Sequence, residues 1–330
     1  MFAAAQITSW HWAGFVACLL IFLALDVGVF HRKAHVVKFK EALLWTSLWF
    51  TLAMAFSLWL RSYVGGKSAM EFFTGYILEL SLSMDNVFVI ALIFSYFAIP
   101  SQYQHRVLFW GILGAIIMRG VMIGVGVAII SAVFWVLYLL GAFLIYTGIK
   151  MLFSETEVHP ENNKVIRLAR KLYPVTPHLD GQKFFTDWNG KRALTPLALV
   201  LLMVETTDLI FAVDSIPAVF AVTTDPFIVF TSNMFAVLGL RSLYFVLAGA
   251  IGYFRYLNVG LSFVLVFIGL KMLLDPHGHE PKPFQFEIPT SVSLAMVAGI
   301  IMLSILVSLL AAFREKRRAA KVPQEQNGRT

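Results

Sequence analysis

Long apolar runs separated by short polar segments make up most of this 330-residue chain. A helix that crosses a bilayer needs about 20 consecutive, mostly apolar residues. By that measure the sequence predicts nine membrane-spanning helices, which cover residues 10–30, 42–60, 72–97, 107–127, 132–153, 194–222, 227–253, 257–274 and 288–313. The predicted fold class is therefore all-α, a polytopic membrane protein of about nine transmembrane helices.

The composition supports a membrane protein and excludes other classes. Hydrophobic residues make up 59% of the chain and charged residues only 14%, whereas soluble domains have about 45–50% and about 25%. No Lys or Arg precedes the first apolar run, so we expect a retained span and not a cleaved signal peptide. The single cysteine, Cys18, excludes an intramolecular disulfide and a cysteine-based metal motif.

The positions of Lys and Arg predict the orientation of the chain. Basic residues follow the first, third, fifth, seventh and ninth predicted spans, and are densest between residues 154 and 192. The positive-inside rule then places the N-terminus outside and the C-terminus in the cytoplasm, and we expect the inner (plasma) membrane. Because this pattern explains the net charge of +7, we expect no nucleic-acid partner.

An internal repeat with opposite orientations is predicted from matched features in the third to fifth and sixth to eighth spans. The third span enters the membrane from outside and the sixth span enters from the cytoplasm, so the two copies are inverted relative to each other. Such repeats, with a polar site near the midplane, are typical of secondary transporters; chance similarity of apolar sequence is the alternative. The matches, in order, are Glu79 with Asp208, Asp85-Asn86 with Asp214-Ser215, Arg119 loosely with Arg241, and Gly148-Ile-Lys-Met-Leu with Gly269-Leu-Lys-Met-Leu.

The domain organisation that follows is a single transmembrane domain, 1–330. Its parts are peripheral spans at 1–70, repeat one at 71–153, a cytoplasmic linker at 154–193 with a short basic helix at 163–172, repeat two at 194–275, and the last span with a basic cytoplasmic tail at 276–330.

Acids inside the predicted spans point to a cation. A carboxylate at the bilayer centre costs roughly 2.5–3.5 kcal/mol on insertion scales, so several in one chain need a compensating partner. All the candidate ligand side chains would bind a metal ion through oxygen atoms, and sites made only of oxygen ligands suit Mg²⁺, Ca²⁺ or Mn²⁺. The candidate metal ligands are Glu79, Asp85, Asn86, Glu205, Asp208, Asp214 and Ser215, with Ser83, Thr206, Thr207, Arg119, Arg241 and Pro217 in supporting positions.

The predicted geometry pairs Asp85 with Asp214 at the midplane, on antiparallel spans, with Glu79 and Asp208 on opposite sides of them. Pro217 lacks an N–H and would free a carbonyl about one turn earlier as a further oxygen ligand.

Alternatives remain open for several charged residues. Asp85 and Asp214 could form structural salt bridges with Arg119 and Arg241, although the four central acids outnumber the two arginines. Glu205 could pair with Lys191 or Arg192 at the interface. Residues near span ends are expected to face water, with the two lysines reaching to the interface: these are Glu71, Asp225, Lys150 and Lys271.

Four strings carry a resemblance to a known family. They are Ser83-Met-Asp85-Asn86-Val-Phe-Val, Phe211-Ala-Val-Asp214-Ser215-Ile-Pro217-Ala, Thr223-Thr-Asp225-Pro226-Phe-Ile-Val and Ser232-Asn233-Met-Phe-Ala-Val-Leu-Gly-Leu-Arg241-Ser-Leu-Tyr244-Phe. In these segments, and over nearly the whole chain, the sequence resembles the TerC/Alx family of integral membrane proteins. The resemblance implies a role in metal homeostasis, with manganese export in the Alx branch, and a link to tellurium resistance. The family's acidic motifs then fall on Glu79, Asp85, Asn86, Glu205, Asp208, Asp214 and Ser215, while Asn233 and Arg241 belong to the matching string of the seventh span.

The expected function is export of a divalent cation, Mn²⁺ first and Ca²⁺ as a possibility, by alternating access coupled to protons. We expect a transporter in the lipid bilayer, not an enzyme, and no organic cofactor. One alternative is an assembly or metalation protein that meets membrane-protein partners through residues 154–193. Another is a tellurium oxyanion transporter with Arg119 and Arg241 as anion ligands, which the surplus of acids disfavours.

Overall fold

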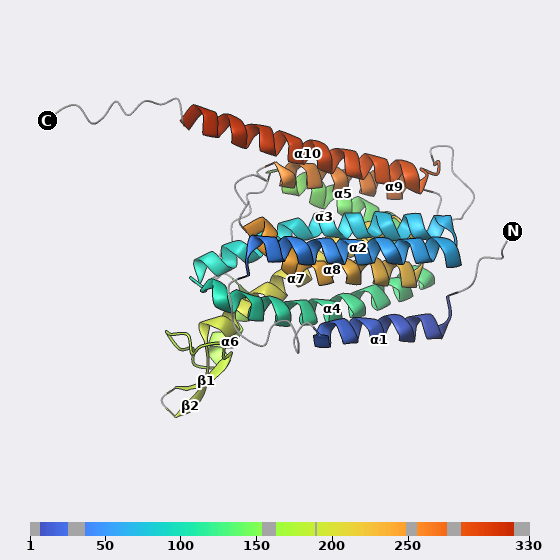
Figure 1. Cartoon of the computed structure of the whole chain (residues 1–330). Helices are drawn as coiled ribbons and strands as arrows, with labels where there is room; N and C mark the ends of the chain where they lie inside the picture. The colour runs from blue at the N-terminus through green and yellow to red at the C-terminus, as the bar shows by residue number, and fades with distance from the viewer. Residues whose placement is uncertain are drawn as a thin grey trace.

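The computed structural model describes residues 7–25, 37–153, 163–188, 190–248, 256–275 and 285–319. Within them the chain forms ten helices and one two-stranded sheet, and most helices run side by side in one bundle (Figure 1). In chain order the elements are α1 Ser9–Leu25, α2 Phe39–Tyr63, α3 Gly66–Tyr96, α4 Ser101–Ala132, α5 Val136–Phe153, α6 Lys164–Leu172, β1 Phe185–Trp188, β2 Lys191–Leu194, α7 Pro196–Phe220, α8 Pro226–Ala248, α9 Leu257–Leu274 and α10 Thr290–Ala319.

The predicted all-α membrane fold is confirmed. Among the described residues, eight helices are long and apolar enough to cross a membrane, namely α2, α3, α4, α5, α7, α8, α9 and α10. The first predicted span, residues 10–30, corresponds to α1, whose 17 described residues fall short of the usual crossing length of about 20. The protein is therefore an integral, multi-pass membrane protein.

Burial separates inner helices from outer ones. In α8, 89% of the most apolar stretch is buried inside the protein, and in α3 67%, against 11% in α2. In Figure 1, α1 and α10 run along opposite sides of the bundle. Polar residues in the middle of α3 and α8, such as Glu79, Asn86 and Asn233, therefore lie in the protein interior, where they must find partners or a ligand.

Three glycines, Gly141, Gly148 and Gly269, mark close contacts between α5 and α9 that recur in reciprocal form. A methyl group on Gly141 of α5 would meet the Gly269 carbonyl oxygen of α9 at 3.0 Å, and one on Gly148 would meet the Ser262 carbonyl oxygen at 2.8 Å. A shift of 121 residues, which superimposes Gly148 on Gly269, also carries Gly141 onto Ser262. This shift therefore relates the Gly141–Gly269 contact to the Ser262–Gly148 contact, with the roles of α5 and α9 exchanged.

The same reciprocity links α3 with α8 and α4 with α7. Gly75 of α3 faces Ser232 of α8, and Gly111 of α4 faces Val204 of α7. The shift that superimposes Asp85 on Asp214 carries Gly75 onto Val204, and the shift of 121 carries Gly111 onto Ser232. Two inverted copies related by a two-fold axis would generate such pairs.

The segment between α5 and α7 has more structure than the sequence pattern predicted. The expected basic helix is present as α6, and Asn163 caps it by accepting hydrogen bonds from the Val165 and Ile166 amides at 2.9 and 3.3 Å. The antiparallel hairpin β1–β2 was not predicted. Its sequence signal was the Asn189-Gly190 dipeptide, a frequent hairpin turn, and Gly190 has a φ of +72°.

Two charged residues that we expected to face water are buried instead. Glu71 is only 8% exposed and accepts a hydrogen bond from Thr223 at 2.9 Å, with Lys67 at 3.9 Å. Lys271 is 5% exposed and lies near Glu71 and Asp275. The predictions for Glu71 and Lys271 were wrong because Glu71 at the start of α3 contacts Thr223 in the connection between α7 and α8, and Lys271 of α9 lies close to the buried Glu71.

The two other residues of that group behave more nearly as predicted. Asp225 is half-buried and caps α8, since its Oδ1 accepts from the Phe227 and Ile228 amides at 2.9 and 3.3 Å. Lys150 is exposed.

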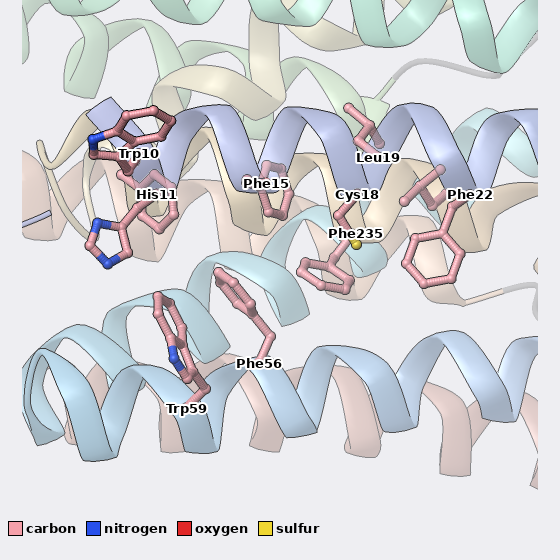
Figure 2. Close-up of a pocket in the computed structure, with 12 residues that line it drawn as sticks. Trp10, His11, Phe15, Cys18, Leu19, Phe22, Phe56, Trp59 and Phe235 are labelled. Atoms are coloured by element: carbon pink, nitrogen blue, oxygen red, sulfur yellow. The ribbon is translucent and has the colours of Figure 1, made fainter. Parts of the chain in front are cut away.

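An apolar pocket of about 380 Å³ lies between α1, α2 and α8 (Figure 2). Phe15, Phe22 and Cys18 of α1 face Phe56 of α2 and Phe235 of α8 across it. No acidic side chain lines this pocket, so it is separate from the acidic residues that the sequence singled out.

Candidate ion-binding site within the membrane

The centre of the candidate site is Arg119, a completely buried side chain of α4. Its guanidinium binds two acids on different helices. Nη1 donates to Glu79 Oε1 of α3. Nη2 donates to Asp208 Oδ1 of α7 at 3.2 Å, and Nε donates to Asp208 Oδ2 at 3.3 Å. A planar guanidinium that meets both oxygens of a carboxylate forms one of the stronger charge-assisted pairs in proteins.

Neutral side chains from three helices complete this cluster. Arg119 Nη1 also donates to Asn233 Oδ1 of α8 at 3.2 Å and to Ser215 Oγ of α7 at 3.5 Å. Asn86 Nδ2 of α3 donates to Asp208 Oδ1 at 3.0 Å, and Ser83 Oγ donates to Glu79 Oε1 at 3.4 Å. The acid–arginine cluster, defined as Glu79, Ser83, Asn86, Arg119, Asp208, Ser215 and Asn233, thus joins α3, α4, α7 and α8.

Helix periodicity explains why these members converge. Residues seven apart lie on nearly the same face of an α-helix, with an offset of only about 20°. Glu79 and Asn86 are seven apart on α3, and Asp208 and Ser215 are seven apart on α7. Each helix therefore presents one acid and one neutral polar group to the cluster.

The predicted pairing of the acids was wrong in one respect. We placed Glu79 and Asp208 on opposite sides of a central Asp85–Asp214 pair, but Arg119 binds both Glu79 and Asp208. Asp85 follows Glu79 by six residues, which turns its side chain about 120° around the helix.

Asp214 contacts a different helix. It is half-buried, accepts a hydrogen bond from Thr147 Oγ1 of α5 at 3.4 Å, and lies near Lys150. The alternative that Asp85 and Asp214 neutralise the arginines is therefore also wrong for Arg119, whose acidic partners are Glu79 and Asp208.

Three buried oxygen atoms on α3 have no hydrogen-bond donor among the described residues. They are Glu79 Oε2, Asp85 Oδ1 and Asn86 Oδ1. All three side chains are at least nine-tenths buried. An unsatisfied buried acceptor costs about 1–3 kcal/mol, and more when it is charged, so this stretch of α3 has unused capacity to coordinate a cation.

Glu205 occupies a separate position next to the cluster. Its half-buried carboxylate lies against Gly114 of α4, where any side chain would overlap it. The alternative partner Arg192 instead lies over the ring of Phe185, 4.9 Å from its centroid.

The remaining supporting residues have other contacts. Thr206 and Thr207 donate to carbonyl groups one turn back in α7, both at 2.7 Å. Pro217 lies inside α7, which continues through it to Phe220. Arg241 is half-buried on α8, about two turns beyond Asn233.

In the described residues, no group of three or more His, Cys, Asp or Glu side chains could by itself hold a metal ion. The carboxylates of Glu79 and Asp208 both contact the guanidinium of Arg119. With two acids and one arginine ionised, the cluster has an excess negative charge, and Asp85 and Glu205 are further carboxyl groups beside it. Such an arrangement can attract a cation, which would compete with Arg119 for the carboxylates of Glu79 and Asp208.

Comparison with known proteins places the chain in a family. Residues 64–318 match the model of the "Integral membrane protein TerC family". The chain is 51% identical over 314 residues to "Uncharacterized membrane protein STKORF319" of Myxococcus xanthus, an alignment that covers 95% of this chain and 96% of that protein.

A second relative is the protein of Escherichia coli named "Putative membrane-bound redox modulator Alx", which is 44% identical over 317 residues, or 93% of this chain and 96% of its own length. No solved structure matches the chain. Since the match to the family covers most of the chain and these relatives align over nearly their whole length, the protein belongs to the TerC family of integral membrane proteins.

Proposed function

We propose that this protein exports a divalent cation, with Mn²⁺ as the first candidate, through the acid–arginine cluster and the adjoining Asp85. The observation that carries the proposal is the row of unsatisfied, buried oxygens on α3, from Glu79, Asp85 and Asn86. Buried acceptors of this kind, next to acids in excess over arginine, match the requirements of a cation and not of an anion.

The donor atoms define the class of ion. The cluster offers carboxylate, amide and hydroxyl oxygens, which suit hard cations such as Mn²⁺, Mg²⁺ and Ca²⁺. Copper, nickel and zinc prefer imidazole or thiolate ligands. Neither type occurs among the polar contacts of Arg119.

Arg119 gives the proposed site a built-in competitor for the ion. Since Arg119 and a metal ion both carry positive charge, an ion that binds Glu79 and Asp208 must weaken their contacts with the guanidinium. Asp85 is buried and is not one of the acidic partners of Arg119, so it would lose its counter-charge when the ion leaves, and a buried carboxylate in that state tends to become neutral by taking up a proton. Release of the ion would in this way be coupled to proton uptake, as an antiporter requires.

Alternating access is the proposed mode of movement. The reciprocal glycine contacts support an inverted repeat of α3–α5 and α7–α9. In transporters of this type the two repeats rock against each other around a site near the midplane. The small residues between α5 and α9 let the two backbones approach closely. We further propose the inner membrane, with the N-terminus outside and the C-terminus in the cytoplasm.

Purified protein in liposomes tests the proposal, with a Mn²⁺-sensitive dye and a pH-sensitive dye in the lumen. Asp85→Asn and Asp208→Asn are each expected to reduce Mn²⁺ flux at least about tenfold, which corresponds to about 1.4 kcal/mol of lost interaction. Asp187→Asn, an exposed acid of the hairpin β1–β2, is the matched control. Unchanged flux in both site variants would rule out the assignment.

The structure weakens the oxyanion alternative. Arg119 donates to two acids and two neutral acceptors, so its N–H groups are engaged by the protein itself. An oxyanion at this position would also meet Glu79 and Asp208 at close range. Inhibition of Mn²⁺ flux by tellurite that depends on Arg119 would favour this alternative.

The name of the Escherichia coli relative suggests a redox role for that protein. The only cysteine of this chain is Cys18, and it lines the apolar pocket away from the acids. A redox effect would therefore act through metal supply and not through a dithiol within the chain. Cys18→Ser is expected to leave Mn²⁺ flux unchanged.

The assembly or metalation alternative depends on residues 154–193. Replacement of this segment by a Gly/Ser linker separates the two functions. Loss of the cellular function with unchanged Mn²⁺ flux would favour an assembly protein.

A further inference from the structure

The helix α6, Lys164–Leu172, has three distinct faces on nine residues. The first is buried: Ile166 is 2% exposed and Ala169 packs beside it against the protein. This face anchors α6, so its position relative to the membrane-spanning helices is determined by packing.

The second face is apolar but exposed. Val165, Leu168 and Leu172 are 40%, 56% and 66% exposed. Their spacing of three and four residues puts them in one stripe along the helix. Large aliphatic side chains that line up on an exposed helix face mark an interaction surface, and no described element covers this stripe.

The third face is basic and lies next to the stripe. It carries Lys164, Arg167, Arg170 and Lys171, all exposed, and α6 contains no acid. With 100° between successive residues, Lys164 and Lys171 fall about 40–60° from Leu168. An apolar stripe bordered by Lys and Arg is typical of helices that lie in a membrane interface.

The depth of α6 agrees with such a position. Ile166 belongs to the same buried cluster as Leu197 and Val200, which lie in the first turns of α7. Since α7 crosses the membrane from Pro196 onward, α6 lies level with the point where a spanning helix meets the bilayer surface. In Figure 1, α6 lies at one end of the bundle together with β1 and β2.

We propose that α6 binds the surface of the surrounding bilayer and selects anionic lipid. Val165, Leu168 and Leu172 insert among the acyl chains near the headgroups, and Lys164, Arg167 and Lys171 bind the lipid phosphates. The positive charge of α6 favours anionic lipid as its binding partner, because basic segments next to a spanning helix are attracted to anionic leaflets. This inference is independent of the transported ion.

Depth-dependent quenching tests the proposal on the full-length protein. A fluorophore is attached to Leu168→Cys in a Cys18→Ser background, and the protein is reconstituted in phosphatidylcholine with or without phosphatidylglycerol. Lipids with a quencher just below the headgroup are expected to quench the label strongly when phosphatidylglycerol is present, and less in its absence or at high salt. A label at Asp187→Cys, on the hairpin, is the control and should stay accessible to an aqueous quencher.

A second set of variants keeps the label position but removes the charge. Lys164→Gln combined with Lys171→Gln is expected to abolish the preference for phosphatidylglycerol while the protein elutes and melts as before. Equal aqueous accessibility of the Leu168→Cys label in both lipid mixtures would overturn the proposal. Protection in native membranes but in neither of the two purified lipid mixtures would also overturn it, and would favour an acidic partner protein.

Discussion

Arg119 of α4 binds both carboxylate oxygens of Asp208 of α7, through Nε at 3.3 Å and Nη2 at 3.2 Å. The same guanidinium reaches Glu79 of α3. The buried, positively charged side chain of Arg119 therefore links Glu79 and Asp208, the two acids that occupy equivalent positions in the repeat alignment. Any cation that passes through this region must meet the same two carboxylates, so stability and transport are expected to depend on the same contacts.

Removal of Arg119 is the first prediction. Arg119→Leu is expected to destabilise the protein by about 3–5 kcal/mol, because it leaves buried carboxylates without a counter-charge. Thermal unfolding in detergent measures the effect. The triple variant with Glu79→Gln and Asp208→Asn should recover part of the loss, since groups in one network are not additive. Equal stability of Arg119→Leu and the wild type would show that these acids are not ionised against Arg119.

Asp85 and Asp208 are predicted to behave differently when each acid is replaced by its amide. Asp208→Asn loses a charged pair and should reduce both stability and Mn²⁺ flux. Asp85→Asn should reduce flux but change stability by less than about 1 kcal/mol, because neutral, hydrogen-bond-capable replacements avoid the cost of an unsatisfied buried charge. Unfolding and liposome flux are measured on the same preparations. A large loss of stability in Asp85→Asn would mean that Asp85 serves the fold and not the ion.

Gly114 is predicted to be required by Glu205. Gly114→Ala places a methyl group onto the Glu205 carboxylate, and overpacking of this kind costs about 1–3 kcal/mol. We expect lower stability, measured by thermal unfolding, and lower Mn²⁺ flux in liposomes.

Two further variants make that prediction specific. Gly124 lies on the same helix, and a methyl group added there would meet nothing within 4 Å, so Gly124→Ala should be neutral or stabilising by about 0.5–1 kcal/mol. Shortening the acid in Gly114→Ala with Glu205→Ala should restore stability but not flux. If the double variant stays as unstable as Gly114→Ala, the overlap with Glu205 is not the cause.

The contact between α5 and α9 supports the last prediction. A methyl group on Gly269 would come within 2.6 Å of the Gly141 carbonyl oxygen, and backbone cannot move aside as a flexible side chain can. Gly269→Ala and Gly148→Ala are each expected to lower stability by about 1–3 kcal/mol through forced separation of the helices. Gly299→Ala in α10, which meets nothing within 4 Å, is the control. Similar losses at the two reciprocal positions would support the inverted repeat, whereas a loss at one position alone would argue against it.

Local composition was enough to predict the membrane class and the spanning helices. A run of about 20 apolar residues can satisfy its backbone in lipid only as a helix, whatever its neighbours are. A short basic helix was also predicted at residues 163–172, and it is present as α6, with Asn163 as its cap. The presence of acids within spans was equally visible, and it identified α3 and α7 as the helices of interest.

The tertiary structure decided which polar groups meet. Rotation of each helix about its axis directs Asn86 and Ser215, and not Asp85 and Asp214, toward Arg119 and its acids. The sequence gives the spacing of residues along one helix. It does not show how each helix is rotated about its axis relative to its neighbours, which depends on the packing of all the side chains between them. The burial of Glu71 and Lys271 depends on the same packing. The two acidic stretches were therefore identifiable from the chain alone, while their joining through a single buried arginine is a property of the folded bundle.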